Sequence, residues 1–83
     1  MQETKSIQTN RTSVTRRVVS TLSRVGIGPQ ELKDVIVTLR SINTHGMYKD
    51  AIPKERRFIY EALARDGVIS KTEEDGKTVF VAI

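Results

Sequence analysis

The segment Pro53–Ile83, PKERRFIYEALARDGVISKTEEDGKTVFVAI, carries the clearest structural signals in the sequence. It opens with proline, which suits the first position of a helix because its missing N–H would have no partner there. Apolar residues then recur at helical spacing, which predicts a helix over residues 53–66 that ends at Asp66-Gly67. The side chains predicted to be buried are Phe58, Ile59, Ala62 and Leu63.

Two runs rich in β-branched and aromatic residues follow this helix, Val68–Thr72 and Lys77–Ile83. Asp75-Gly76 between them favours a tight hairpin, because both central positions of such a turn require positive φ. Helix, glycine stop and β-hairpin therefore form one predicted unit.

An amphipathic helix is predicted over Ser13–Val25, with the hydroxyl of Thr12 or Ser13 as its N-cap. Its apolar stripe has helical spacing and consists of Val14, Val18, Leu22 and Val25. Gly26 and Gly28 end the helix, and Ile27 between them is a candidate for a very short strand.

A second amphipathic helix is predicted to begin at Pro29. Its apolar arc consists of Leu32, Val35, Ile36, Leu39 and Ile42. Val37 lies off this arc and is expected to be exposed. Residues 43–52 contain several turn-forming residues and are expected to be a loop.

The expected fold class is therefore mainly α with a C-terminal β-hairpin, an α+β fold. Residues 1–12 show no apolar periodicity and are expected to be a flexible N-terminal tail. Residues 13–83 are expected to form the domain.

The chain of 83 residues has 14 Lys and Arg against 10 Asp and Glu, a balance that favours a polyanionic partner. It has no cysteine and one histidine, His45, so no metal site is predicted. No nucleophile–base set and no phosphate-binding glycine loop is present, so we expect neither an enzyme nor a bound cofactor or small molecule. No apolar run is long enough to span a membrane, which favours the cytoplasm, or the host cytoplasm if the protein is viral.

Basic residues on the expected outer face of the 53–66 helix indicate nucleic-acid binding. Lysine and arginine pair with phosphates or guanine edges, and tyrosine can hydrogen-bond to phosphate. The candidate DNA-binding residues are Lys54, Arg56, Arg57 and Tyr60 on this helix, with Arg16, Arg17, Arg24 and Lys49 as further cations. The alternative is an ordinary solvated helix face on which glutamates pair with these cations.

Over residues 13–83 the chain resembles winged helix-turn-helix DNA-binding domains. The resemblance lies in RRVVSTLSRVGIGPQEL and in IYEALARDGVI followed by EDGKTVFVAI. Leu63, Gly67 and Val68-Ile69 match the usual junction between the recognition helix and the wing. The resemblance implies three helices followed by a two-stranded wing, with the 53–66 helix in the major groove and Lys54, Arg56, Arg57 and Tyr60 as its readers.

Two features depart from that pattern. About ten residues separate the second and third predicted helices, where a helix-turn-helix uses a turn of about 3–4. The predicted wing tip, Glu73-Glu74-Asp75, is acidic and would repel phosphate.

The resulting expectation is a small protein that binds double-stranded DNA, a transcriptional or replication regulator of a prokaryote, mobile element or virus. A single small module offers little interface, so a homodimer or a protein partner would supply specificity. The alternative is a winged-helix protein–protein interaction module that binds a polymerase or host factor.

Overall fold

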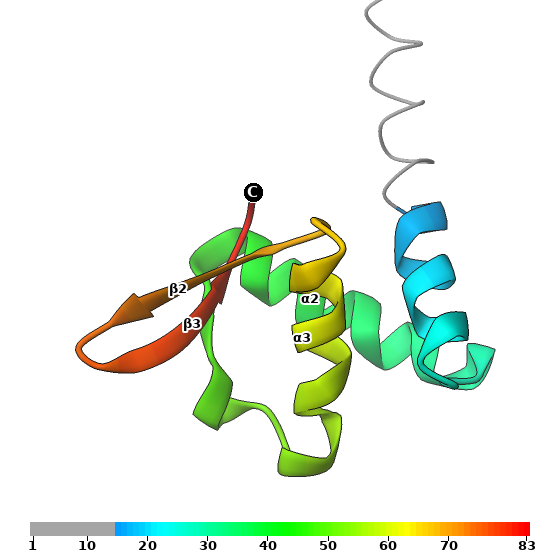
Figure 1. Ribbon diagram of the computed structural model, residues 1–83, viewed down its shortest axis with the longest axis horizontal. Helices are drawn as coiled ribbons and strands as arrows, with labels where there is room; N and C mark the ends of the chain where they lie inside the picture. Colours follow the sequence, from blue (N-terminus) through cyan, green and yellow to red (C-terminus); the bar gives the residue numbers. More distant parts are fainter. Residues whose placement is uncertain (1–14) are drawn as a thin grey trace, which may run out of the picture.

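The computed structural model describes residues 15–83 and has an α+β fold, with three helices and a three-stranded antiparallel sheet (Figure 1). The predicted tail, the N-cap at Thr12 or Ser13, and Val14 lie outside the described residues. The first helix, over residues 15–24, buries Val18 and Leu22 as predicted.

The second helical segment begins with a 3-10 turn, η1 (Pro29–Glu31), and continues as α2 (Leu32–His45). Val35, Leu39 and Ile42 are buried along α2, whereas Val37 is 58% exposed, as predicted. The expected loop from residue 43 is wrong at its start, because the helix continues to His45. In this last turn the Thr44 hydroxyl donates a 2.8 Å hydrogen bond to the Arg40 carbonyl oxygen.

Regular structure also interrupts the rest of the expected 43–52 loop. Strand β1 (Met47–Tyr48) pairs with the last strand, and a 3-10 turn, η2 (Lys49–Ala51), follows it. The short strand was expected at Ile27 instead, and that expectation is wrong. Ile27 lies outside the strands formed by residues 15–83 and packs, half-buried, against the core.

The third helical segment consists of a 3-10 turn, η3 (Lys54–Arg56), and α3 (Arg57–Arg65). Pro53 is extended, with ψ of 138°, so it precedes the helix and does not start it. Ile59, Ala62 and Leu63 are buried as predicted. The two aromatic residues are exchanged relative to expectation, because Tyr60 is 1% exposed and Phe58 is 47% exposed.

The hairpin consists of β2 (Ser70–Glu74) and β3 (Lys77–Val81). The predicted turn is confirmed, with φ of 54° at Asp75 and 77° at Gly76. The sheet order is β1-β3-β2, and the register pairs Met47 with Phe80 and Ser70 with Val81.

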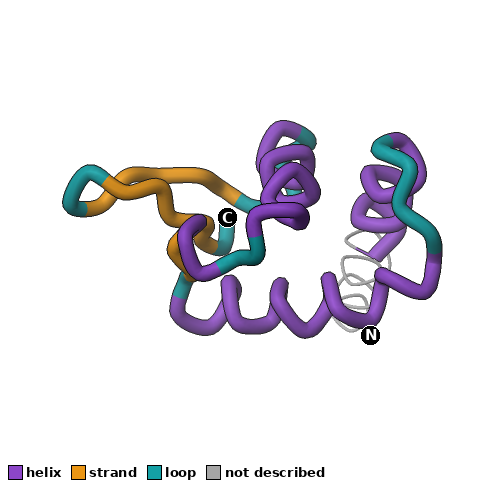
Figure 2. Tube along the Cα trace, turned by 90° about the horizontal axis from the view of Figure 1, so that it is seen from below, coloured by secondary structure: helices purple, strands orange, loops and turns teal. Residues whose placement is uncertain are grey.

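The core lies where the first helix, α2, α3 and the sheet meet. Figure 2 shows α3 and the first helix standing on the same side of α2, with the hairpin extending beyond α3. The buried residues of the core cluster are Val18, Leu22, Val35, Leu39, Ile42, Ile52, Ile59, Tyr60, Leu63, Ile69 and Phe80. None of the described helices has the length and apolarity needed to cross a membrane.

Candidate nucleic-acid interface

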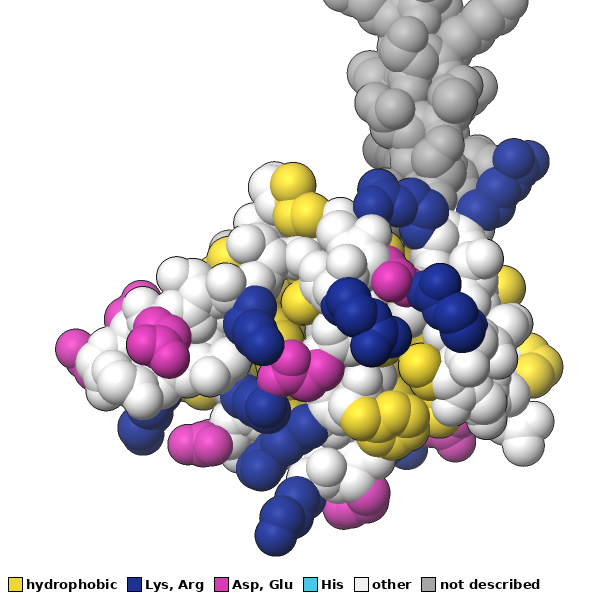
Figure 3. Space-filling view, in the orientation of Figure 1, with side chains coloured by type: hydrophobic (Ala, Val, Ile, Leu, Met, Phe, Trp, Pro, Cys, Tyr) yellow, Lys and Arg dark blue, Asp and Glu magenta, His cyan; other side chains and the backbone are white. Residues whose placement is uncertain are grey.

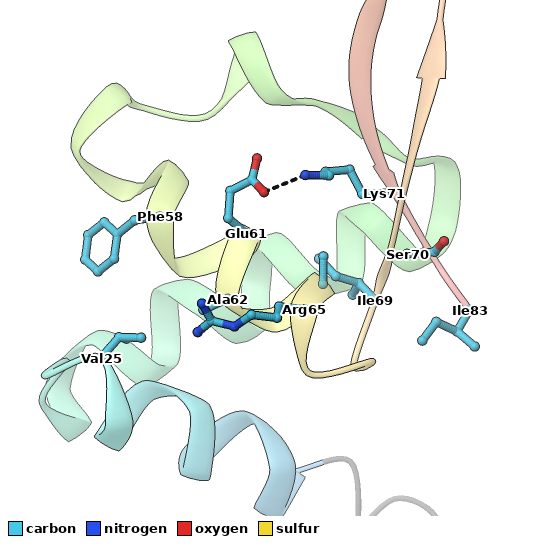
Figure 4. A pocket seen from close by; sticks show the side chains of 10 residues that line it. Val25, Phe58, Glu61, Ala62, Arg65, Ile69, Ser70, Lys71 and Ile83 are labelled. Carbon is cyan, nitrogen blue, oxygen red and sulfur yellow. Dashed lines mark hydrogen bonds and ion pairs between the residues drawn. The ribbon is translucent and has the colours of Figure 1, made fainter.

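The outward side of α3 forms the floor of an open groove of about 1020 Å³. Phe58, Glu61 and Arg65 follow one another along it at helical spacing, as Figure 4 shows. Val25 from the end of the first helix lies on one side, and Lys71 from β2 lies on the other. Both neighbours of α3 therefore contribute side chains to this surface.

Glu61 holds two lysines on this face. Lys49 Nζ donates to Glu61 Oε2 at 2.6 Å, and Lys71 Nζ donates to Glu61 Oε1 at 2.8 Å. The hydrogen bond from Lys49 and then that from Lys71 lower the pKa of Glu61 below its ordinary value. We call these three residues the Glu61 cluster. It joins α3 to the turn after β1 and to β2.

Asp66 at the C-terminal end of α3 holds two arginines of the first helix. Arg24 forms an ion pair with the Asp66 carboxylate, and Thr21 donates a 2.6 Å hydrogen bond to the same Oδ2 atom. Arg17 donates to the Asp66 carbonyl oxygen at 2.9 Å, which satisfies a carbonyl that has no partner within the helix. These four residues form the Asp66 cluster.

Each of the two clusters carries a surplus of positive charge. In both, one carboxylate is matched by two cations, so each cluster has a net charge of +1. Arg65 and Lys54 are exposed and have no ion-pair partner among residues 15–83. Figure 3 shows Lys and Arg side chains gathered over α3 and the segments beside it. This face therefore suits an anion that contacts several cations at once.

Two of the arginines predicted to contact DNA form ion pairs or hydrogen bonds with other parts of the protein. Arg56 forms ion pairs with Glu31 at 3.1 Å and Asp34 at 3.2 Å, which draws it toward α2 and leaves that group with a net negative charge. Arg57 Nε donates to the Ile52 carbonyl oxygen at 2.9 Å, so it supports the turn that precedes α3. Both guanidiniums are therefore held against neighbouring segments of the protein.

The other candidate DNA-binding residues are buried, exposed or part of the two clusters. Tyr60 packs in the core with its ring centroid 6.2 Å from that of Phe80, so its placement on the outer face was wrong. Lys54 and Arg16 are exposed, as expected for residues that contact phosphate. Arg17, Arg24 and Lys49 lie in the two clusters around α3.

Sequence reasoning missed four residues of this surface: Phe58, Glu61, Arg65 and Lys71. The spacing of Phe58, Glu61 and Arg65 along one helical face was a signal that could have revealed the first three. Lys71 had no such signal, since its contact with Glu61 depends on where β2 lies relative to α3.

The hairpin tip has the opposite charge. Glu73, Glu74 and Asp75 are all exposed there. Tyr48 of β1 donates a 2.8 Å hydrogen bond to Glu74, and this bond raises the pKa of the tyrosine. Lys77 lies 5.8 Å from the centroid of the Tyr48 ring. The molecule is therefore polarised, with the acidic tip away from the cations that surround α3.

No metal centre is formed by the side chains of residues 15–83. His45 is exposed, and its Nδ1 lies 2.8 Å from the Gly46 carbonyl oxygen. Comparison with known proteins found no matching protein-family model, no similar curated protein and no similar solved structure.

Proposed function

We propose that this chain is a small double-stranded DNA-binding protein, which places the outer face of α3 in the major groove. The observation that carries the proposal is the surplus of positive charge in the Glu61 and Asp66 clusters on either side of α3. Cations that are already held in position lose less freedom when they bind phosphate. Such contacts would supply affinity without sequence preference.

Base contacts in this arrangement would come from α3 itself. Arg65 is exposed on the groove floor and can pair with guanine, the commonest specific contact in the major groove. Phe58 is 47% exposed on the same face and can pack against a thymine methyl group. Lys54, at the exposed first turn, is placed to contact phosphate. The proposed readers thus shift from Arg56, Arg57 and Tyr60 to Phe58 and Arg65.

We further propose a winged-helix arrangement, with α3 as recognition helix and β2–β3 as wing. Three features support it. Gly67, with φ of 78°, leads directly from α3 into the hairpin, and the Val68 amide closes the helix by donating to the Leu63 carbonyl oxygen at 2.9 Å. A short strand, β1, pairs with the second wing strand. The connection between α2 and α3 is longer than the turn of a helix-turn-helix, and β1 lies within it, so this connection has regular structure.

An interaction module that binds another protein is the second candidate. Two exposed apolar side chains favour it. Phe58 and Ile83, 47% and 80% exposed, both line the α3 groove. Exposed apolar side chains around a groove are typical of sites for protein partners. The acidic hairpin tip also suits a basic protein better than DNA.

Titration of a fluorescently labelled random-sequence duplex separates the two candidates. The DNA-binding proposal predicts an anisotropy increase at ~50 mM salt and a large loss of affinity at ~200 mM, because counterions are released from several phosphates. No binding at micromolar protein and low salt would reject the proposal and favour the interaction module.

A further inference from the structure

We propose that Lys49 and Lys71 together bind one backbone phosphate of DNA, and that Glu61 is the residue that positions them. The inference rests on the proposed function and adds a defined contact to it. The two lysines come from segments far apart in the chain, the turn after β1 and strand β2, and both form ion pairs with Glu61 on α3.

The geometry leaves both ammonium groups able to bind. Each Nζ donates to one carboxylate oxygen of Glu61, at 2.6 Å for Lys49 and 2.8 Å for Lys71. A lysine ammonium has three N–H donors, so each keeps two for another acceptor. One phosphate that accepts from both lysines would complete a group with two cations and two anions, which balances the charge of the cluster.

Two opposing effects of Glu61 decide the outcome. Its negative charge repels a phosphate, although the adjacent lysines screen that repulsion. In the other direction, a long lysine side chain loses rotamer freedom when it binds, and the ion pair has already removed much of that freedom. We infer that the second effect is larger, because one carboxylate orders two flexible side chains.

The matched pair Glu61→Gln and Glu55→Gln tests this inference directly. Both changes remove one negative charge from the same helical segment, and Glu55 is exposed without an ion-pair partner among residues 15–83. They therefore change the net charge equally, and only Glu61→Gln removes a carboxylate that holds two lysines. Affinity for the labelled random-sequence duplex is measured across ~50–200 mM salt, and circular dichroism confirms that each variant is folded.

Glu55→Gln is expected to bind the duplex with an affinity equal to that of wild type or slightly higher. Glu61→Gln is expected to bind several-fold more weakly, with the slope of log K against log salt reduced by about 0.9, the contribution of one phosphate. Lys71→Gln should reproduce that smaller slope and tests the phosphate contact itself if Glu61→Gln does not fold.

Two results would overturn the inference, and they are distinguishable. If wild type binds DNA but Glu61→Gln binds as tightly as Glu55→Gln with an unchanged slope, the proposed function survives and the phosphate site does not. If wild type fails to bind the duplex at low salt, both are rejected.

Discussion

The Thr21 hydroxyl donates a 2.6 Å hydrogen bond to Asp66 Oδ2 and so joins two residues that are 45 positions apart. Thr21 is 1% exposed, and its partner ends α3. A carboxylate at a helix C-terminus is unfavourable, because the negative end of the helix dipole lies there. Thr21 and Arg24 offset this cost, and the same contacts fix the first helix beside α3.

Replacement of Thr21 by valine keeps a similar size but removes this hydrogen bond. We expect the free energy of unfolding to fall by about 1.5–3 kcal/mol, the contribution of a hydrogen bond to a charged group. Urea denaturation measures the change. Thr44→Val is the control, because Thr44 is exposed and should change stability by no more than ~0.5 kcal/mol. Equal stability of Thr21→Val and wild type would show that the hydrogen bond from Thr21 to Asp66 does not stabilise the fold.

Gly67 cannot accept a side chain without cost. Its φ is 78°, and a Cβ atom there would lie 3.1 Å from Arg17 Nη2. Gly67→Ala is therefore expected to destabilise the protein by about 1–2 kcal/mol, the cost of left-handed backbone for an L-residue. Gly28→Ala is the control, since Gly28 has φ of −76° and the nearest atom to its Cβ position lies 3.9 Å away. Similar melting temperatures for the two variants would contradict this account.

The aromatic residues of α3 are expected to differ sharply in their effect on stability. Tyr60→Ala removes a buried ring that packs near Phe80 and should cost about 3–5 kcal/mol. Phe58→Ala removes a ring that is 47% exposed and should cost about 1 kcal/mol or less. Chemical denaturation of both variants checks the orientation of α3, and the opposite order of stability would show that the helix is rotated.

Tyr60 should also make stability depend on pH in the alkaline range. Burial raises the pKa of Tyr60 above its ordinary value near 10. Because the folded state holds this proton more tightly, the raised pKa contributes to the free energy of unfolding. This contribution is complete below pH ~10 and is lost as pH rises further. Tyr60→Phe has no such proton, so its stability should fall less than that of wild type above pH ~10. Parallel curves for the two proteins would exclude this role for Tyr60.

The error over Phe58 and Tyr60 has a simple geometric origin. At about 100° per residue, both lie roughly 100° from the centre of the arc formed by Ile59, Ala62 and Leu63. Periodicity therefore could not distinguish them, and the more apolar side chain was expected inside. The position of the sheet decides the matter, because Phe80 of β3 lies beside Tyr60.

Local chemistry predicted much of the rest of the fold. The Asp75-Gly76 turn, the buried residues of α2 and the exposure of Val37 follow from backbone preferences and spacing within short segments. The pairing of β1 with β3, and of Lys71 with Glu61, joins segments that are distant in sequence. Such contacts have no periodic signal, so the candidate interface was the least predictable part.

Two charge reversals test whether DNA binds the face around α3. Arg65 lies on the α3 groove floor, whereas Arg40 lies on α2 in a separate depression beside Val37. Arg65→Glu and Arg40→Glu change the net charge equally. A difference in their duplex affinity at ~50 mM salt therefore reports where the charge lies and not how much charge is lost. We predict that Arg65→Glu weakens binding about tenfold or more and that Arg40→Glu stays within about threefold of wild type. Equal losses in the two variants, or no binding by wild type, would contradict the account.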